Sequence, residues 1–113
     1  IQVGKPAIDG LTHSLRDDDK NVRRAAAKAL GKIGVDDEIA VRVLASALED
    51  EDSAVRRFAA EALGRLGDGV VVPELAEVLN DQNPRTRIAA FRALATLNTP
   101  EAAAAMRKWA RDQ

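Results

Sequence analysis

The sequence has 113 residues, with 17 Lys and Arg against 18 Asp and Glu and a formal net charge of -1. This balance gives no overall electrostatic case for a nucleic-acid or membrane partner, and no apolar run approaches the roughly 20 residues that a bilayer crossing needs. Cysteine is absent, which excludes disulfides and thiolate chemistry and is compatible with an intracellular protein; we expect a cytoplasmic one.

Apolar residues recur at helical spacing along the whole chain, and no segment alternates as a strand would, so we expect an all-α protein. In chain order, the apolar residues that mark the first six helices are Ile8, Leu11 and Leu15; Val22, Ala26, Leu30 and Ile33; Ile39, Val41, Leu44 and Leu48; Val55, Ala59, Leu63 and Leu66; Val72, Leu75, Val78 and Leu79; Ile88, Phe91 and Leu94. We expect most of them to form the inner faces of their helices. A last helix over residues 102–111 is expected to cover the end of the core, with Trp109 as its lid.

Residues that stop and start helices mark the expected boundaries. Pro6 and Pro84 suit first turns, where a missing N–H costs nothing. Asp19 is expected to cap the helix over residues 20–33, and Gly34 to end it.

One stretch occurs three times. Residues 50–67, DEDSAVRRFAAEALGRLG, match residues 17–34, DDDKNVRRAAAKALGKIG, at 11 of 18 positions, and residues 81–98 form a looser copy, offset by 33 and then 31 residues. A repeat of this length predicts a stacked array of helix pairs, held closely together by small residues at the contacts. The small residues are Ala26, Ala29, Ala59, Ala62, Ala90 and Ala93. We expect one repeat domain over residues 1–113, with repeats at about 5–34, 37–67 and 70–98 and a cap helix at 100–112.

The motif L-x-D-x-[DN]-x-x-[VT]-R-x-x-A-x-x-A-L, read from Leu15, Leu48 and Leu79, resembles the HEAT family in its short, phycobilisome-lyase-type form. The resemblance implies a right-handed α-solenoid, an armadillo-like α–α superhelix with second helices on the concave side, and a scaffold or binding role. It also implies a structural ladder between turn aspartates and helix arginines, which can pair bidentately. Its members are Asp17, Arg23, Asp50, Arg56, Asp81 and Arg87. The third copy departs from the pattern at Thr86, Ala95 and Asn98.

The residues available for catalysis are few. The single histidine, His13, falls at an exposed position of a first helix, and there is no Cys–His pair, no supported Ser–His–Asp set and no H-E-x-x-H motif. The acidic runs at residues 17–19 and 49–52 lack the spacing of a calcium loop. We therefore expect a protein that is not an enzyme and that has no cofactor and no metal site.

The copies differ most beside the buried stripe of each second helix. These positions carry Arg24, Lys28, Lys32, Arg57, Phe58, Glu61, Arg65, Arg85, Ile88 and Arg92, a net of +6. On a shared concave face they would form a basic groove with Phe58 and Ile88 as apolar anchors, the composition typical of a binding surface. We expect a protein-interaction scaffold that binds an acidic segment of a protein partner there.

Other functions remain open. The resemblance admits a subunit or fragment of a HEAT-like bilin lyase, whose relatives attach bilins to phycobiliproteins as paired chains. The basic face also admits nucleic-acid backbone binding, although stacking aromatics are scarce and the turn acids would repel a polyanion. Because the chain begins without Met, we expect a processed or excised piece. The likeness of residues 1–4 to the end of a copy admits a third alternative, an internal section of a longer repeat array whose only task is spacing.

Overall fold

The computed structural model describes residues 4–33, 37–67 and 69–113. Within these ranges the chain forms seven α-helices, one short 3-10 turn and no β-strand. The helices are α1 (Gly4–Ser14), α2 (Lys20–Ile33), α3 (Glu38–Ala47), α4 (Ser53–Leu66), α5 (Val72–Val78), α6 (Pro84–Leu97) and α7 (Pro100–Arg111), and the 3-10 turn η1 (Gly69–Val71) precedes α5. The expected helix stop at Gly34 and the likeness of residues 1–3 to a repeat end lie outside the described residues.

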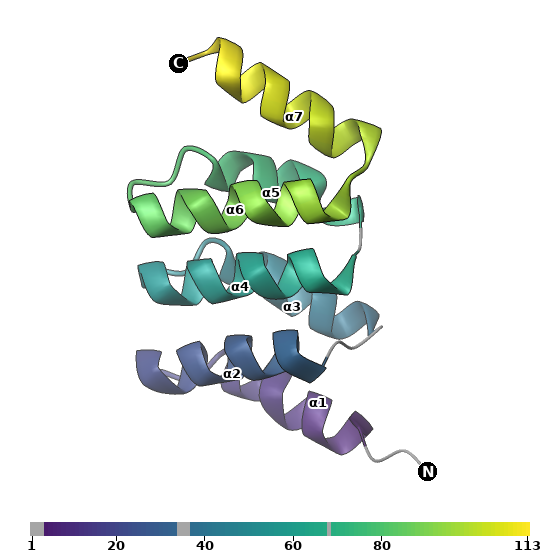
Figure 1. Ribbon diagram of the computed structural model, residues 1–113. Helices are drawn as coiled ribbons and strands as arrows, with labels where there is room; N and C mark the ends of the chain where they lie inside the picture. Colours follow the sequence, from purple (N-terminus) through teal and green to yellow (C-terminus); the bar gives the residue numbers. More distant parts are fainter. Residues whose placement is uncertain (1–3, 34–36, 68) are drawn as a thin grey trace.

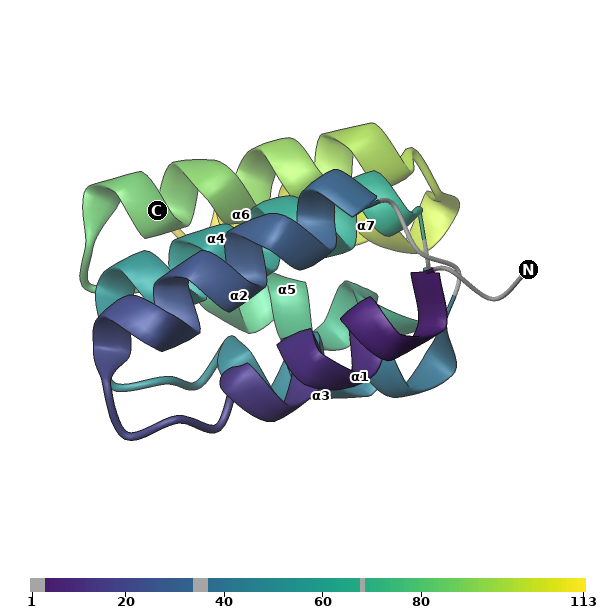
Figure 2. The same cartoon turned by 90° about the horizontal axis from the view of Figure 1, so that it is seen from below.

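The helices are arranged in two layers. Helices α2, α4 and α6 lie side by side in one layer, and α1, α3 and α5 lie behind them (Figure 1); the view from below separates the layers (Figure 2). Helix α7 packs against α5 and α6 at the end of the stack. The molecule measures 46 × 29 × 16 Å along its principal axes, the elongated shape of stacked hairpins. The expected all-α solenoid is confirmed.

The helices begin at residues whose side chains accept first-turn N–H groups, and they end at residues that adopt a left-handed backbone conformation. Asp19 and Asp52 accept first-turn N–H groups of α2 and α4 at 2.8 and 3.0 Å. Helix α4 ends at Gly67 with φ 68°, and α6 ends at Asn98 with φ 51°. Both are left-handed conformations, which Gly and Asn tolerate best. Asn98 therefore ends its helix as Gly67 does, which explains that departure of the third copy.

The core lies between the two layers and is built from Leu, Val and Ala. The largest fully buried side chains include Leu30, Leu44, Leu63, Leu75, Leu79, Leu94 and Val55. Of the small residues expected at helix contacts, Ala26, Ala59, Ala62, Ala90 and Ala93 are buried and Ala29 is half-buried. From α7, Trp109 packs against this core and meets Phe91 edge-on, with ring centroids 6.1 Å apart.

Three of the apolar residues that mark the helices are exposed and not part of the core: Ile33, Ile39 and Phe91, at 44%, 62% and 42%. Ile39 lies outside the face of α3 formed by the buried positions 40, 43, 44 and 47. Ile33 is the last residue of α2, and Phe91 of α6 is covered only in part, by the Trp109 ring of α7. Ile88 borders a groove between α4 and α6.

The front-layer helices approach each other through one repeated stripe. In α2 it reads Arg23, Ala27 and Gly31, and in α4 Arg56, Ala60 and Gly64. The same positions of α6 carry Arg87, Phe91 and Ala95, of which Phe91 and Ala95 are exposed, and α6 meets α4 through Ala93 instead. A Cβ on Gly31 would lie 3.0 Å from the Cβ of Ala62, and one on Gly64 would lie 2.8 Å from the Cα of Ala93. Glycine is therefore required for this spacing of α2, α4 and α6.

Candidate functional site

A ladder of charged side chains joins successive hairpins. Arg23 donates to the Asp50 carboxylate from Nε at 2.9 Å and from Nη2 at 3.3 Å, and Arg56 donates to Asp81 at 2.7 and 3.1 Å. Each arginine also donates from Nη1 to a carbonyl of its own hairpin, Asp17 O for Arg23 and Asp50 O for Arg56. One guanidinium thus fixes its own turn and the next turn together.

The first aspartate and the last arginine of this ladder have no ion-pair partner among the described residues. Arg87 donates to the Asp81 carbonyl at 2.7 Å but reaches no carboxylate. The Asp17 carboxylate accepts only the N–H of Asp19, within its own turn, at 2.8 Å. The six-residue spacing inside one copy therefore reflects the carbonyl contact, whereas the carboxylate partner comes from the next copy.

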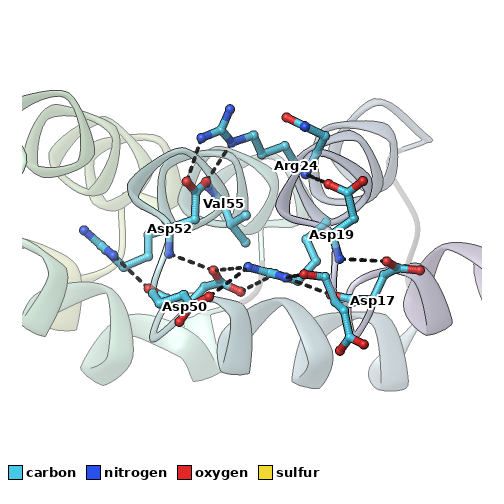
Figure 3. Close-up of polar contacts among 11 residues, drawn as sticks. Asp17, Asp19, Arg24, Asp50, Asp52 and Val55 are labelled. Atoms are coloured by element: carbon cyan, nitrogen blue, oxygen red, sulfur yellow. Dashed lines mark hydrogen bonds and ion pairs between the residues drawn. The ribbon is translucent and has the colours of Figure 1, made fainter.

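A second ion pair runs beside the first. Arg24 donates to Asp52 from Nε at 2.8 Å and from Nη2 at 2.6 Å (Figure 3). Arg24 was expected on the open basic face, and its charge is instead neutralised across the α2–α4 contact. In the next copy the position of Asp52 is held by the neutral Asn83, so Arg57, the counterpart of Arg24, lies over the Phe58 ring at 4.8 Å.

These ion pairs shift the pKa values of their carboxyl groups. The hydrogen bonds from Arg24 lower the pKa of Asp52 well below its ordinary range, against the opposing effect of burial. Burial would raise the pKa of Asp81, but the hydrogen bonds from Arg56 and from the Asn83 N–H outweigh it and lower that pKa too. Both carboxylates therefore stay ionised in the folded protein at neutral pH.

The lowered pKa values predict a loss of stability in acid. A carboxyl whose pKa is lower in the folded state stabilises the fold fully above its ordinary pKa of about 4, and this contribution is lost as the pH falls through the folded value. We expect urea midpoints to decline from about pH 4 downward. In Asp52→Asn, which does not titrate, the decline should be shallower; an unchanged pH profile would contradict the assignment.

Four of the other expected basic residues, Arg57, Arg65, Arg85 and Arg92, line a groove between α4 and α6, which we call the α4–α6 groove. It has a volume of about 560 Å³ and is lined by Arg57, Glu61, Gly64, Arg65, Arg85, Ile88, Ala89, Arg92, Ala93 and Thr96. Four arginines and one carboxylate give it a positive charge. The Nε of Arg57 is buried and has no hydrogen-bond partner within the described ranges.

The other expected site residues lie in a separate hollow. Phe58 is half-buried against the core and borders a space of about 50 Å³ between α2 and α4, together with Lys28 and Lys32. The Lys28 ammonium lies 5.9 Å from the Phe58 ring centre. The sequence predicted Phe58 as an apolar anchor of the groove. In the structure it lies between the Lys28 and Arg57 side chains instead and does not project into the groove. Ile88 alone of the two anchors borders the α4–α6 groove.

Sequence reasoning missed Asp52 as the partner of Arg24. The signal was present, because an arginine pair follows a D-x-D turn in both of the first two copies, at Arg23–Arg24 and Arg56–Arg57. It also missed an acidic hollow of about 370 Å³ on the opposite layer, between α3 and α5, whose lining includes Glu49, Glu74, Glu77 and Asp81.

The described residues hold no further arrangement typical of a catalytic, metal or membrane site. His13 is exposed on α1. No group of three or more His, Asp or Glu residues in the described parts of the chain is placed to hold a metal ion. No helix within residues 4–33, 37–67 and 69–113 combines the length and apolar character of a membrane span.

Comparison with known proteins connects this architecture to a family. The model of the HEAT repeats matches residues 2–50 and 41–113. Among solved structures, the chain is similar to the complex of CpcE and CpcF of phycocyanin lyase from Nostoc sp. PCC7120, with 36% identity and a TM-score of 0.85 over 90% of this chain. It spans 41% of the length of that lyase chain. A search of curated proteins gave no match.

A second solved structure, of an engineered protein, is 24% identical with a TM-score of 0.71 and covers 90% of this chain and 50% of its own; it shows the fold alone. The similarity to phycocyanin lyase contradicts the expectation that the protein is not an enzyme. That expectation came from the lack of a catalytic motif in the sequence. A helical-repeat fold by itself does not exclude an enzymatic function. The repeated motif, the stacked hairpins and the family match agree that the chain belongs to the HEAT-repeat family.

Proposed function

We propose that this chain is the HEAT-repeat part of a phycocyanin-lyase-type protein, acting together with a second HEAT-like chain to attach a bilin to a phycobiliprotein. The observation that carries the proposal is the similarity to the CpcE–CpcF complex over 90% of the chain. Residues 1–113 form one repeat domain in this proposal, with three hairpins followed by α7. The domain supplies surfaces that hold the proteins of the reaction in place.

The α4–α6 groove is the proposed binding surface for an acidic segment of a protein partner. Arg65, Arg85 and Arg92 are exposed along its length and Ile88 is half exposed, so charge and an apolar contact are offered together. Arginine beside apolar surface is typical of residues that dominate binding energy. With Arg24 neutralised by Asp52, the groove is the main concentration of unneutralised arginines on this face.

The proposal is tested by letting the protein that carries this chain take the place of one lyase subunit in the bilin-attachment reaction. The protein that carries this chain is combined with CpcE or with CpcF, then with phycocyanin lacking its bilin and with free bilin. We expect bilin to become covalently attached in one of the two combinations, seen as visible absorbance that stays with phycocyanin after denaturation. If neither combination attaches bilin above the rate without this protein, the lyase proposal is wrong.

A charge reversal tests the groove. Arg65→Glu, Arg85→Glu and Arg92→Glu together should weaken binding of phycocyanin or of the second HEAT-like chain at least about tenfold, because same-sign charges then face the acidic segment. Binding is measured by titration calorimetry at two salt concentrations, and the wild-type affinity should fall with added salt.

The matched control reverses the same number of charges elsewhere. Arg16, Arg107 and Arg111 are exposed and lie outside the groove lining, so their replacement by Glu should leave the affinity within about twofold. Equal losses in both triple variants would mean that total charge, and not the groove, governs binding.

A further inference from the structure

The charged side chains of the α4–α6 groove do not neutralise one another. Glu61 lies four residues from both Arg57 and Arg65 along α4, the spacing at which ion pairs form on a helix. In the described part of the chain, however, no ion pair involves any residue of the groove lining. Four arginines and one carboxylate are therefore available to an occupant of the groove.

The order of these side chains along the groove follows from the packing of its two helices. Helices α4 and α6 lie side by side and run in the same direction (Figure 1). A Cβ on Gly64 would lie 2.8 Å from the Cα of Ala93, so these two residues mark one level on both helices. Because a helix rises about 1.5 Å per residue, Arg65 and Arg92 lie within about 2 Å of that level. We call these two residues the C-terminal arginines.

The other two arginines lie at the opposite end of the groove. Arg57 and Arg85 come seven and eight residues before the same level, which places them about 11 Å nearer the start of the two helices. We call them the N-terminal arginines. Between the two sets lie Ile88, about 8 Å before the level, and Glu61, about 5 Å before it. Along the groove the order is thus cation, apolar side chain, carboxylate and cation.

An α-helix places side chains at this spacing along one face. Its residues i, i+3, i+4 and i+7 lie on the same side, and the distance from i to i+7 is about 10.5 Å along the axis. A β-strand rises about 3.3 Å per residue, so side chains about 11 Å apart would be three positions apart and would point to opposite faces. The groove therefore matches a helix and not a strand.

We propose that the α4–α6 groove binds a helical segment of a partner protein with an acidic residue at i, an apolar residue at i+3, Lys or Arg at i+4 and an acidic residue at i+7. The acidic residues meet the two sets of arginines, the apolar residue meets Ile88, and the cation meets Glu61. Glu61 is then the residue that sets specificity. This inference rests on the proposed binding function of the groove and adds a positive charge that the occupant must carry. Total charge alone would select the most acidic segment.

Two synthetic peptides separate selection by this pattern from selection by total charge. Both are alanine-rich; the lysine peptide contains E-A-A-L-K-A-A-E and the glutamate peptide contains E-A-A-L-E-A-A-E. Their binding to the protein that carries this chain is followed by fluorescence anisotropy. We expect the lysine peptide to bind at least about fivefold more tightly, although it is the less acidic of the two.

Reversing the charge of Glu61 should invert this preference. In Glu61→Lys, the glutamate peptide should bind at least about fivefold more tightly than the lysine peptide. Comparing each peptide between the two proteins cancels any difference in helicity between the free peptides. The matched control is Glu77→Lys, at an exposed position of α5 outside the groove lining. It changes the net charge equally and should keep the wild-type preference.

Two results would overturn the assigned pattern while leaving the proposed function intact. The first is equal or tighter binding of the glutamate peptide by the wild-type protein, which would mean that total charge governs binding. The second is an unchanged preference in Glu61→Lys, which would mean that Glu61 does not contact the i+4 position.

Two other results would contradict the groove or its occupant. If the triple variant Arg65→Glu, Arg85→Glu, Arg92→Glu binds both peptides as the wild type does, the peptides bind elsewhere and the proposed binding surface is wrong. If the protein binds neither peptide, the partner assignment is overturned. Binding by residues 1–113 alone in that case would identify a segment of the protein's own chain as the occupant.

Discussion

Replacing Asp81 with Asn is expected to lower the free energy of unfolding by about 3 kcal/mol. The carboxylate accepts two hydrogen bonds from Arg56, at 2.7 and 3.1 Å, and one from the Asn83 N–H at 2.9 Å. Asparagine preserves the bond within the turn but leaves the buried Arg56 guanidinium without its hydrogen-bonded carboxylate. Urea unfolding followed by circular dichroism measures the effect.

Two variants check that the loss comes from the unpaired charge. Asp18→Asn, at an exposed position, should change the free energy of unfolding by less than about 0.5 kcal/mol. Arg56→Met combined with Asp81→Asn should lose less than the sum of the single changes, since no buried charge is left alone. Additive losses would indicate that the two side chains do not interact.

Replacing Gly64 with Ala is expected to lower the free energy of unfolding by about 2 kcal/mol. The new methyl would lie 2.8 Å from the Cα and 2.9 Å from the Cβ of Ala93, so α4 and α6 must move apart. This cost exceeds the gain of about 1 kcal/mol that alanine brings to a helix interior.

The control is a glycine in open space. Nothing lies within 4 Å of a Cβ on Gly10 in α1, so Gly10→Ala should raise the free energy of unfolding by about 0.5 to 1 kcal/mol. Gly31→Ala should fall between the two, because its Cβ contact with Ala62 is 3.0 Å. If both Gly10→Ala and Gly64→Ala stabilise the protein, the close packing of α4 on α6 is wrong.

The helices could be predicted from the sequence because their signals are local. Pro84, Asp52 and the spacing of apolar residues act within a few turns, and α2, α4 and α6 follow them. The exposure of Phe91 could not be predicted in this way. Whether that residue is covered depends on a neighbouring helix, and no further front-layer helix packs on α6 in the described chain.

The candidate site was only partly predictable for the same reason. Helical spacing predicts Arg65, Arg85 and Arg92 beside the buried stripes of their helices, and in the structure these three residues line one groove. It could not show that Arg24 reaches Asp52, which lies 28 residues later and meets it only after the hairpins stack. Asp52 carries a charge and neutralises Arg24, whereas its counterpart Asn83 is neutral. Arg57, the counterpart of Arg24, therefore keeps its charge for a binding partner.

The Arg–Ala–Gly stripe of α4 has a consequence for how such chains grow. The middle hairpin, residues 37–67, presents aspartates and Ala62 on one side and Arg56, Arg57 and Gly64 on the other. A duplicate inserted directly after it would therefore meet the groups that it already contacts, without adjustment of either neighbour. Gene duplication at this junction would lengthen the protein one unit at a time, whereas Phe91 and Ala95 make the α6 side resistant to the same event.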